Sequence, residues 1–320
     1  MTRHSMKLVL LPVMVVMAAL LMVSSGWCGS INSSAGTSAF SFLKINEAAR
    51  PVAMGGAFTG VADDEASLYY NPAGLVNFED DRYILGYHNY VVDMQSGMVG
   101  VVHPMSDDRA LAFHINYLNY GEFKETDKLG NQTGTFGGGD LVLAGTFAMR
   151  RSYNLSLGVT GKFIYEKIQD FSATGVALDL GIRYTTDRNR YSVGLMVQNL
   201  GTQLSALGEG DKDPLPTTLR AGVGARPKGL PMLLAGDVIV PFDNDIDFAL
   251  GAEYVELKPM LLRIGYNSFG SNYKAEESDD SLAGIAVGVG FDFKSMQISY
   301  AFSPAADLGD SHRITLTGGF

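Results

Sequence analysis

Cysteine and positive charge are scarce in this sequence of 320 residues. Its one cysteine is Cys28, and 24 lysine and arginine residues stand against 34 aspartate and glutamate residues. If a leader that includes Cys28 is cleaved, no thiol remains, which excludes disulfide bonds and thiol catalysis. The same cleavage removes Arg3 and Lys7, which leaves 22 basic against 34 acidic residues and changes the formal net charge from −10 to −12. A chain this acidic is a poor partner for nucleic acid.

Long apolar runs are also absent after the first 28 residues. The leader has a basic start, an apolar run over residues 8–23 and a small-residue region, which together predict a signal peptide over residues 1–28. A signal anchor is one alternative, but this run is shorter than the about 20 residues that a spanning helix needs. Lipidation of Cys28 is another, disfavoured because the bulky Trp27 precedes it. Any later membrane crossing must therefore use strands.

From Arg82 onward, segments of about ten residues alternate large apolar residues with small or polar ones. In residues 282–293, for example, Val287, Val289 and Phe291 alternate with glycine and with Asp292. One face of such a strand suits lipid and the other a crowded lumen. A soluble β-sandwich alternates too, but glycine, alanine and charged residues would fill its core poorly. The sequence therefore predicts an all-β fold, a transmembrane outer-membrane β-barrel over residues 82–320.

The number of these segments is fourteen, an even number, as in bacterial outer-membrane barrels. They begin near Arg82, Gln95, Arg109, Asp140, Tyr153, Thr174, Arg190, Thr217, Leu230, Ile246, Pro259, Leu282, Ser295 and Ser311. Short connections alternate with longer ones at residues 121–139, 201–216, 270–281 and 303–310, which predicts short periplasmic turns and long outer loops. The last segment stops at Phe320 and resembles the terminal assembly signal of such barrels, so the barrel assembly machinery is an expected partner.

Several ionisable residues take inward positions in this register, and the lumen is the tolerable place for them at membrane depth. The lumen candidates are His88, His114, Lys162, Glu166, Asp179, Arg183 and Arg263, with Arg220, Asp247, Glu253 and Asp292 as further inward residues. Salt bridges to the segment before the barrel are favoured over ligand binding. The available partners there are Lys44, Glu47, Arg50, Asp63 and Asp64.

Catalytic and metal motifs are not found in the sequence. It contains no His-Glu-x-x-His and no Gly-x-Ser-x-Gly. His88 and His114 could face each other across the lumen, but a third metal ligand is not evident. Residues 55–60 lack the Gly-Lys-Ser/Thr of a phosphate loop, and residues 243–254 lack the glycine and glutamate of a calcium loop. We therefore expect no enzymatic activity, no metal and no cofactor.

The stretch before the barrel differs in kind. Its distinctive runs are Ala39–Ile45, Ala49–Phe58, Val61–Asp64 and Tyr69–Leu75. They strongly resemble the amino-terminal region of the PorV/PorQ family, itself similar to the FadL-type long-chain fatty-acid transporters. The resemblance implies a hatch, over residues 29–81, that folds inside the lumen. The Asn71-Pro72-Ala73 turn belongs to it, and Arg50, Gly55 and Gly56 are its other candidate gating residues; glycine permits turns that other residues resist.

Two function classes remain open. Resemblance to FadL implies passage of hydrophobic small molecules through a hatch-gated lumen, with capture by Leu118, Phe123, Leu129, Phe136, Leu204 and Leu207 of the outer loops. Resemblance to PorV implies a partner-binding component of type IX secretion without solute transport. Thin capture loops, and the absence of glycine over residues 111–120, weigh against transport. We expect a monomeric barrel surrounded by outer-membrane lipids that passes hydrophobic molecules, with the secretion role as the alternative.

Overall fold

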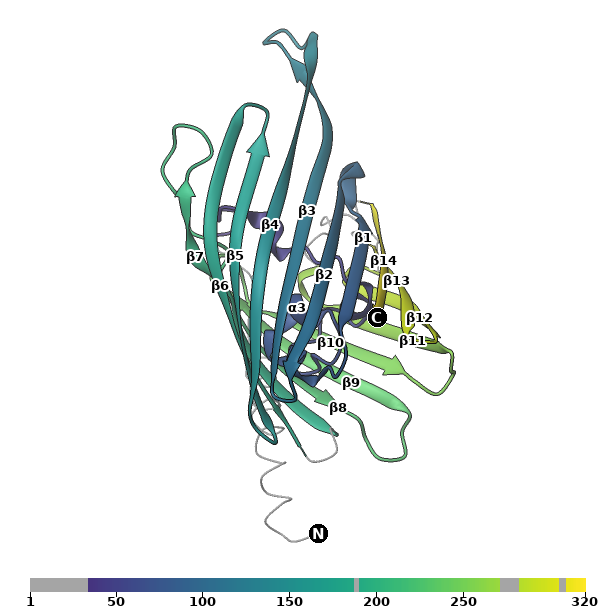
Figure 1. The fold of residues 1–320 in the computed structure, drawn as a ribbon. Helices are drawn as coiled ribbons and strands as arrows, with labels where there is room; N and C mark the ends of the chain where they lie inside the picture. Colours follow the sequence, from purple (N-terminus) through teal and green to yellow (C-terminus); the bar gives the residue numbers. More distant parts are fainter. Residues whose placement is uncertain (1–33, 187–189, 271–281, 305–308) are drawn as a thin grey trace. The chain divides into compact units, whose positions relative to one another are not determined.

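The computed structural model describes residues 34–186, 190–270, 282–304 and 309–320. Within them, fourteen antiparallel strands close into a barrel, because β1 pairs with both β2 and β14 (Figure 1). This confirms the predicted all-β barrel and its strand number. The strands are β1 (Arg82–Asn89), β2 (Gln95–Ser106), β3 (Arg109–Thr126), β4 (Gln132–Ser152), β5 (Leu155–Ile168), β6 (Phe171–Thr185), β7 (Tyr191–Ser205), β8 (Thr218–Ala225), β9 (Met232–Pro241), β10 (Asp247–Tyr254), β11 (Met260–Asn267), β12 (Ile285–Phe293), β13 (Met296–Pro304) and β14 (Asp310–Gly319).

Side-chain alternation decides which face of the wall is apolar. In β6, Val176, Leu178 and Leu180 are between 39% and 48% exposed, whereas Ala177 and Asp179 between them are buried. Successive side chains of a strand point to opposite faces, so the apolar set covers the outer face and the small and polar set faces inward. This is the reverse of a sandwich, whose large apolar side chains face its interior.

One predicted loop is wrong. The sequence predicts a loop over residues 121–139, but β3 and β4 continue through most of it as a hairpin, so β4 begins eight residues before the predicted start at Asp140 (Figure 1). Phe123 and Phe136 stack across this hairpin with ring centroids 5.4 Å apart, and Asp127 accepts backbone N–H bonds in its turn. These contacts hold a glycine-rich sequence extended. The other predicted strand starts lie within three residues of the observed ones.

The connections at the two ends of the barrel differ in length. At the end that carries Phe320, only residues 107–108, 153–154 and 294–295 join β2 to β3, β4 to β5 and β12 to β13. At the opposite end, residues 206–217 join β7 to β8, although β5 and β6 are joined by a tight turn. The predicted signal peptide, the first five residues of the predicted hatch, the predicted turn at 187–189 and much of the predicted loops at 270–281 and 303–310 lie outside the described residues.

Residues 34–81, the N-terminal segment, form short helices joined by irregular turns. These are η1 (Ser41–Lys44), α2 (Ala49–Ala53), α3 (Ser67–Tyr70) and η2 (Pro72–Asn77); a further turn of helix, η3 (Val91–Asp93), joins β1 to β2. None of the described helices is long and apolar enough to cross a membrane. In this segment α2 packs against β11 to β14 and η2 against β3 to β6. The segment therefore contacts strands on opposite sides of the closed ring.

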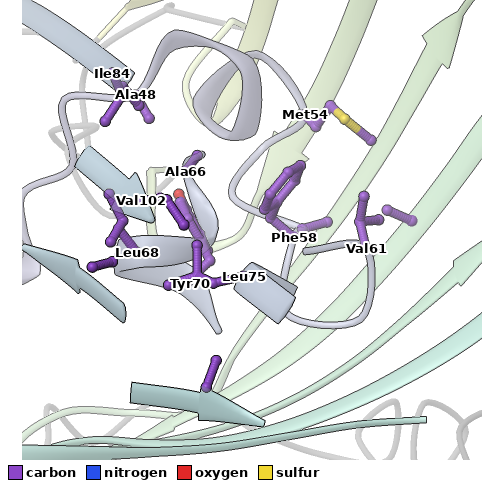
Figure 2. Packing of buried hydrophobic residues seen from close by; sticks show 14 of the residues in the cluster. Ala48, Met54, Phe58, Val61, Ala66, Leu68, Tyr70, Leu75, Ile84 and Val102 are labelled. Carbon is purple, nitrogen blue, oxygen red and sulfur yellow. The ribbon is translucent and has the colours of Figure 1, made fainter. Parts of the chain in front are cut away.

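The apolar core lies between this segment and the barrel wall. Met54, Phe58 and Leu68 of the segment are fully buried and belong to one cluster with Ile84 of β1 and Val102 of β2 (Figure 2). Full burial of such a side chain stabilises a fold by about 1.5–3 kcal/mol. This cluster ties the N-terminal segment to the strands, together with a second one in which Phe42 and Leu43 pack with Leu118 of β3 and Ile164 of β5.

Candidate functional site

The turn predicted at Asn71-Pro72-Ala73 is buried and contacts the wall. The Asn71 amide Nδ2 donates to the carbonyl oxygen of Thr59 at 2.9 Å and to that of Ile182 in β6 at 3.1 Å, while its Oδ1 accepts the N–H of Ala73 at 3.2 Å. Pro72 follows as the first residue of η2, where its missing N–H costs nothing. One side chain therefore caps a helix and links two parts of the segment to the wall.

Glycine is required where this turn meets the strands. A Cβ built on Gly158 of β5 or Gly181 of β6 would overlap Pro72 or the Asn71 side chain. Within the segment, Gly55 and Gly56 have φ angles of 68° and 85°, which other residues adopt only with strain. Gly55 also lies directly against the backbone of β11. Both glycines were expected for the turns they permit, and for Gly55 the close approach to the wall is a second reason.

Arg50 is the centre of a buried ionic network. Its Nη1 contacts Asp63 at 2.7 Å and Asp64 at 2.9 Å, and its Nε and Nη2 both donate to the Glu253 carboxylate of β10 at 2.8 Å. Arg263 of β11 donates to the same carboxylate at 2.6 Å. Burial raises the pKa of Asp63, but Arg50 and Arg226 outweigh it, so this pKa lies below its ordinary value. The expected salt bridging between segment and wall is present at this point.

Two carboxylates that the sequence analysis did not select also anchor the segment. Asp237 of β9 accepts the backbone N–H groups of Phe58 and Thr59 at 3.2 and 3.0 Å. Asp243, in the connection after β9, pairs with Lys44 and accepts a 2.6 Å hydrogen bond from Ser38. In the sequence, Asp243 stood out only as the first residue of the rejected calcium loop. No local signal identifies such anchors, because their partners are almost 180 residues or more away in the chain.

The other lumen candidates are inward, yet they do not form one site. Lys162 of β5 pairs with Asp179 of β6 at 2.7 Å, beside a bulge of β7 in which Asn199 has a φ of 56°. Arg183 donates to the carbonyl of Gly60 at 3.2 Å. Glu166 lies opposite Asp140 in register. These residues support the wall and the segment at separate points.

The two histidines are not brought together. His88 lies opposite Ser96 of β2, with its ring nitrogens 3.2 Å from the Ser96 hydroxyl and 2.7 Å from that of Ser311, whereas His114 lies opposite Gly100, four residues along β2. The suggested pair facing each other across the lumen is therefore wrong, because the register separates them along the wall. Among the described residues, no cluster of three histidine, cysteine, aspartate or glutamate side chains could hold a metal.

A cavity of about 610 Å³ lies beside the N-terminal segment, between it and the strands. Among the described residues, six aromatic side chains line it: Phe42, Tyr69, Tyr70, Tyr90, Tyr120 and Phe269. Arg220 is one of its polar residues; it donates to the carbonyl of Gly56 at 2.6 Å and lies over the Tyr70 ring at 4.9 Å. Of the predicted capture residues, Leu118 is buried and lines this cavity, while Phe123, Leu129, Leu204 and Leu207 are exposed. The cavity thus suits a small apolar molecule.

Glu47 gives the segment a pH dependence that can be measured. Its carboxylate is buried and accepts a 2.8 Å hydrogen bond from Asn116 of β3. Burial raises its pKa to about 7 from an ordinary 4.5, against the lowering effect of its backbone hydrogen bond, Arg313, Asn116 and Ser96. The folded protein therefore holds this proton where the unfolded chain has lost it. The free energy of unfolding is therefore highest, as far as Glu47 is concerned, below pH 4.5, where the group is protonated in both states. It falls by roughly 3 kcal/mol as the pH rises from 4.5 through about 7.

Thermal unfolding in detergent tests this expectation. The unfolding midpoint should be lower at pH 8 than at pH 5, and Glu47→Gln, which stays neutral, should reduce the difference. Glu209→Gln, on an exposed connection, serves as the matched control. An equal pH slope in wild type and Glu47→Gln would contradict the assignment.

Solved structures of several known proteins share this fold. The toluene transporter TodX of P. putida superposes with a TM-score of 0.61 at 14% identity, over 87% of this chain and 99% of that one. This chain has the fold of these outer-membrane transporters. The CymD monoaromatic hydrocarbon channel (TM-score 0.57, 12% identity, 88% and 99% covered) and a Pseudomonas aeruginosa FadL homologue (0.53, 11%, 92% and 100%) agree.

Sequence-based comparison found no relative. No family model and no curated protein matches the chain. The predicted membership of the PorV/PorQ family therefore stays a prediction. At identities of 11–14%, the structural likeness describes the fold and leaves ligand and partner open.

Proposed function

We propose that this protein lies in the outer membrane and passes hydrophobic small molecules through its barrel. The observation that carries the proposal is the aromatic cavity of about 610 Å³ beside the N-terminal segment. Burial of an apolar ligand there would gain about 25 cal/mol per Å² of apolar surface. The exposed apolar outer face supports the location, as do the structural neighbours, which are named as transporters or channels for toluene and monoaromatic hydrocarbons.

The N-terminal segment would be the gate. It contacts strands on opposite sides of the ring, so a molecule passing through the lumen has to displace it. Arg50 with Glu253, and Asn71 with the Ile182 carbonyl, are the contacts that such a movement breaks. In this proposal Asn71, Pro72, Ala73, Gly55, Gly56 and Arg50 act as gating residues. The segment is held by many separate contacts, which suits a hatch that opens rarely.

A reversible tether tests passage and gating together. A Cβ on Gly224 of β8 would lie 3.5 Å from the Cα of Val61 in the segment, close enough for a disulfide between Val61→Cys and Gly224→Cys. The probe is an uncharged aromatic such as toluene, and the liposomes carry lipopolysaccharide in their outer leaflet, because a plain phospholipid bilayer lets such a probe through unaided. In a Cys28→Ser background, the oxidised protein should block protein-dependent flux of this probe, and a reductant should restore it. Each single-cysteine variant is the control. Equal flux through the oxidised and reduced double variants would refute the gate, and no flux above protein-free liposomes in wild type would refute passage itself.

A second function, docking of a protein partner as in type IX secretion, is favoured by the β3–β4 hairpin. Pairing with β2 ends at Asn119 and pairing with β5 ends at Gly138, so the hairpin continues with two edges that no described strand covers. Such edges offer backbone groups to a strand of another protein. Mass spectrometry of gently extracted native protein would separate the two functions. A stoichiometric protein lost on deletion of residues 121–138 favours docking, whereas enriched hydrocarbons or fatty acids without such a protein favour passage.

A further inference from the structure

The outer wall carries a hollow of about 570 Å³ over β4 to β7, on the opposite face of the wall from the aromatic cavity. Its walls are the exposed side chains of Leu143, Phe163, Leu178 and Leu200. Its floor includes Gly161, which takes an outward position in β5 between Val159 and Phe163. The nearest atom to a Cβ built there is Leu178 Cδ2, at 3.9 Å. The hollow is thus a place where the apolar outer face lacks one side chain.

The neighbouring strand repeats this feature. Gly145 of β4 is the direct cross-strand partner of Gly161 and occupies the same outer face. A Cβ on Gly145 would meet no atom closer than Phe113 Cε1 at 3.5 Å. Two adjacent outward glycines therefore form a depression among leucine and phenylalanine side chains, where a Cβ on either would meet no atom closer than 3.5 Å.

A basic residue lies farther along the same strand face. Lys167 is exposed and, like Gly161 and Phe163, takes an odd-numbered outward position in β5. Six residues of strand place it about 20 Å from Gly161. Its cross-strand partners are Gly139 and Ser172, neither of which carries a charge. Tyr165 lies between the hollow and this lysine, as aromatic residues do at a membrane interface.

From these positions we propose that the outer face of β4 to β7 binds one phosphate-bearing membrane lipid, with an acyl chain in the hollow and its phosphate at Lys167. An apolar hollow on a membrane face excludes water, and a flexible hydrocarbon chain that fills it regains dispersion contacts that an unfilled surface lacks. The distance from the hollow to Lys167 suits a long molecule with one charged end. A second barrel that placed an apolar ridge in the hollow would have no use for the lysine. The inference rests on the membrane location of the proposed function and is independent of passage through the lumen.

Native mass spectrometry of the delipidated full-length protein tests this site. Palmitoyl-oleoyl phosphatidylglycerol is the probe, and diacylglycerol with the same chains is the uncharged comparison. Wild type should bind one phosphatidylglycerol about tenfold more tightly than Gly161→Leu, in which the new side chain takes up part of the hollow directly over β5. Lys167→Gln should lose the preference for phosphatidylglycerol over diacylglycerol. Ala221→Leu, which places the same leucine side chain at an outward position of β8, should bind as wild type does.

The outcomes that overturn the proposal are equally specific. Equal binding by wild type and Gly161→Leu would refute the hollow as the site, and an unchanged preference in Lys167→Gln would refute the phosphate contact. A dimer in wild type that Gly161→Leu abolishes would assign the hollow to a second copy instead. Gly145→Leu repeats the test from β4 if Gly161→Leu does not assemble. This experiment measures binding and no flux, so a protein that passes nothing through its lumen can still bind the lipid. Failure of the lipid site can therefore be told apart from failure of the proposed passage.

Discussion

Arg50→Met is expected to detach the N-terminal segment from the wall while the barrel remains closed. The change leaves the half-buried Asp63 and Asp64 close to the buried Glu253 without the guanidinium that joins them. Breaking a buried ion pair from one side costs about 3–5 kcal/mol. Here Glu253 keeps Arg263 and Asp63 keeps Arg226, while Asp64 loses the arginine with which it pairs. Flux of an uncharged aromatic probe into liposomes with lipopolysaccharide in their outer leaflet should rise well above that of wild type. Hydrogen exchange of the backbone over residues 49–77 should accelerate in parallel.

Two further variants make this result interpretable. Arg50→Lys keeps the charge but loses the two-pronged contact with Glu253, so its effect should be intermediate. Arg109→Met removes an exposed arginine at the start of β3 and should behave as wild type. If Arg50→Met shows wild-type flux and wild-type exchange, this network does not hold the segment.

Gly181→Val is expected to have the second large effect, from the other side of the same contact. Valine suits a strand, but its Cβ would overlap the Asn71 side chain and Pro72, so the turn has to move away from β6. The barrel should assemble, as judged by heat-modifiable migration in gels, while probe flux rises. Asn71→Ala should change flux in the same direction by less, because it removes hydrogen bonds worth about 1 kcal/mol each without adding bulk.

The control for added bulk is Gly236→Val. Gly236 lies opposite Leu250 on the outer face of β9, and a Cβ there would meet no atom closer than 3.4 Å. It should assemble and leave flux unchanged. Wild-type flux in Gly181→Val would show that the position of the Asn71-Pro72 turn does not limit passage.

The arrangement of the wall could be predicted from the sequence because its signal is local. Each strand must present apolar side chains on one face and small or polar ones on the other, and this period of two is visible in any ten residues. Counting the segments was sufficient for strand number and approximate bounds. The β3–β4 hairpin was missed because its glycine-rich strands carry little alternation. What holds them extended is a pairing of Phe123 with Phe136 across the turn.

Inward charges were also predictable, but their partners were not. Glu253 is inward because its strand alternates, and that follows from the sequence alone. Its pairing with Arg50, 203 residues away, exists only because the ring closes around the N-terminal segment. The two histidines show the same limit. Alternation places both His88 and His114 inward, but their height on the wall depends on strand register, and their partners on β2 are four residues apart.

By itself, then, the sequence determined the strand pattern, the number of strands, the polarity of each face and the glycine-rich turns of the N-terminal segment. The tertiary structure decided which charges pair, which glycines leave room for the segment, and where aromatic side chains from distant parts of the chain enclose a cavity. The physical reason is that alternation is a property of neighbouring residues, whereas ion pairs, close backbone approach and enclosed volume depend on the closure of the ring.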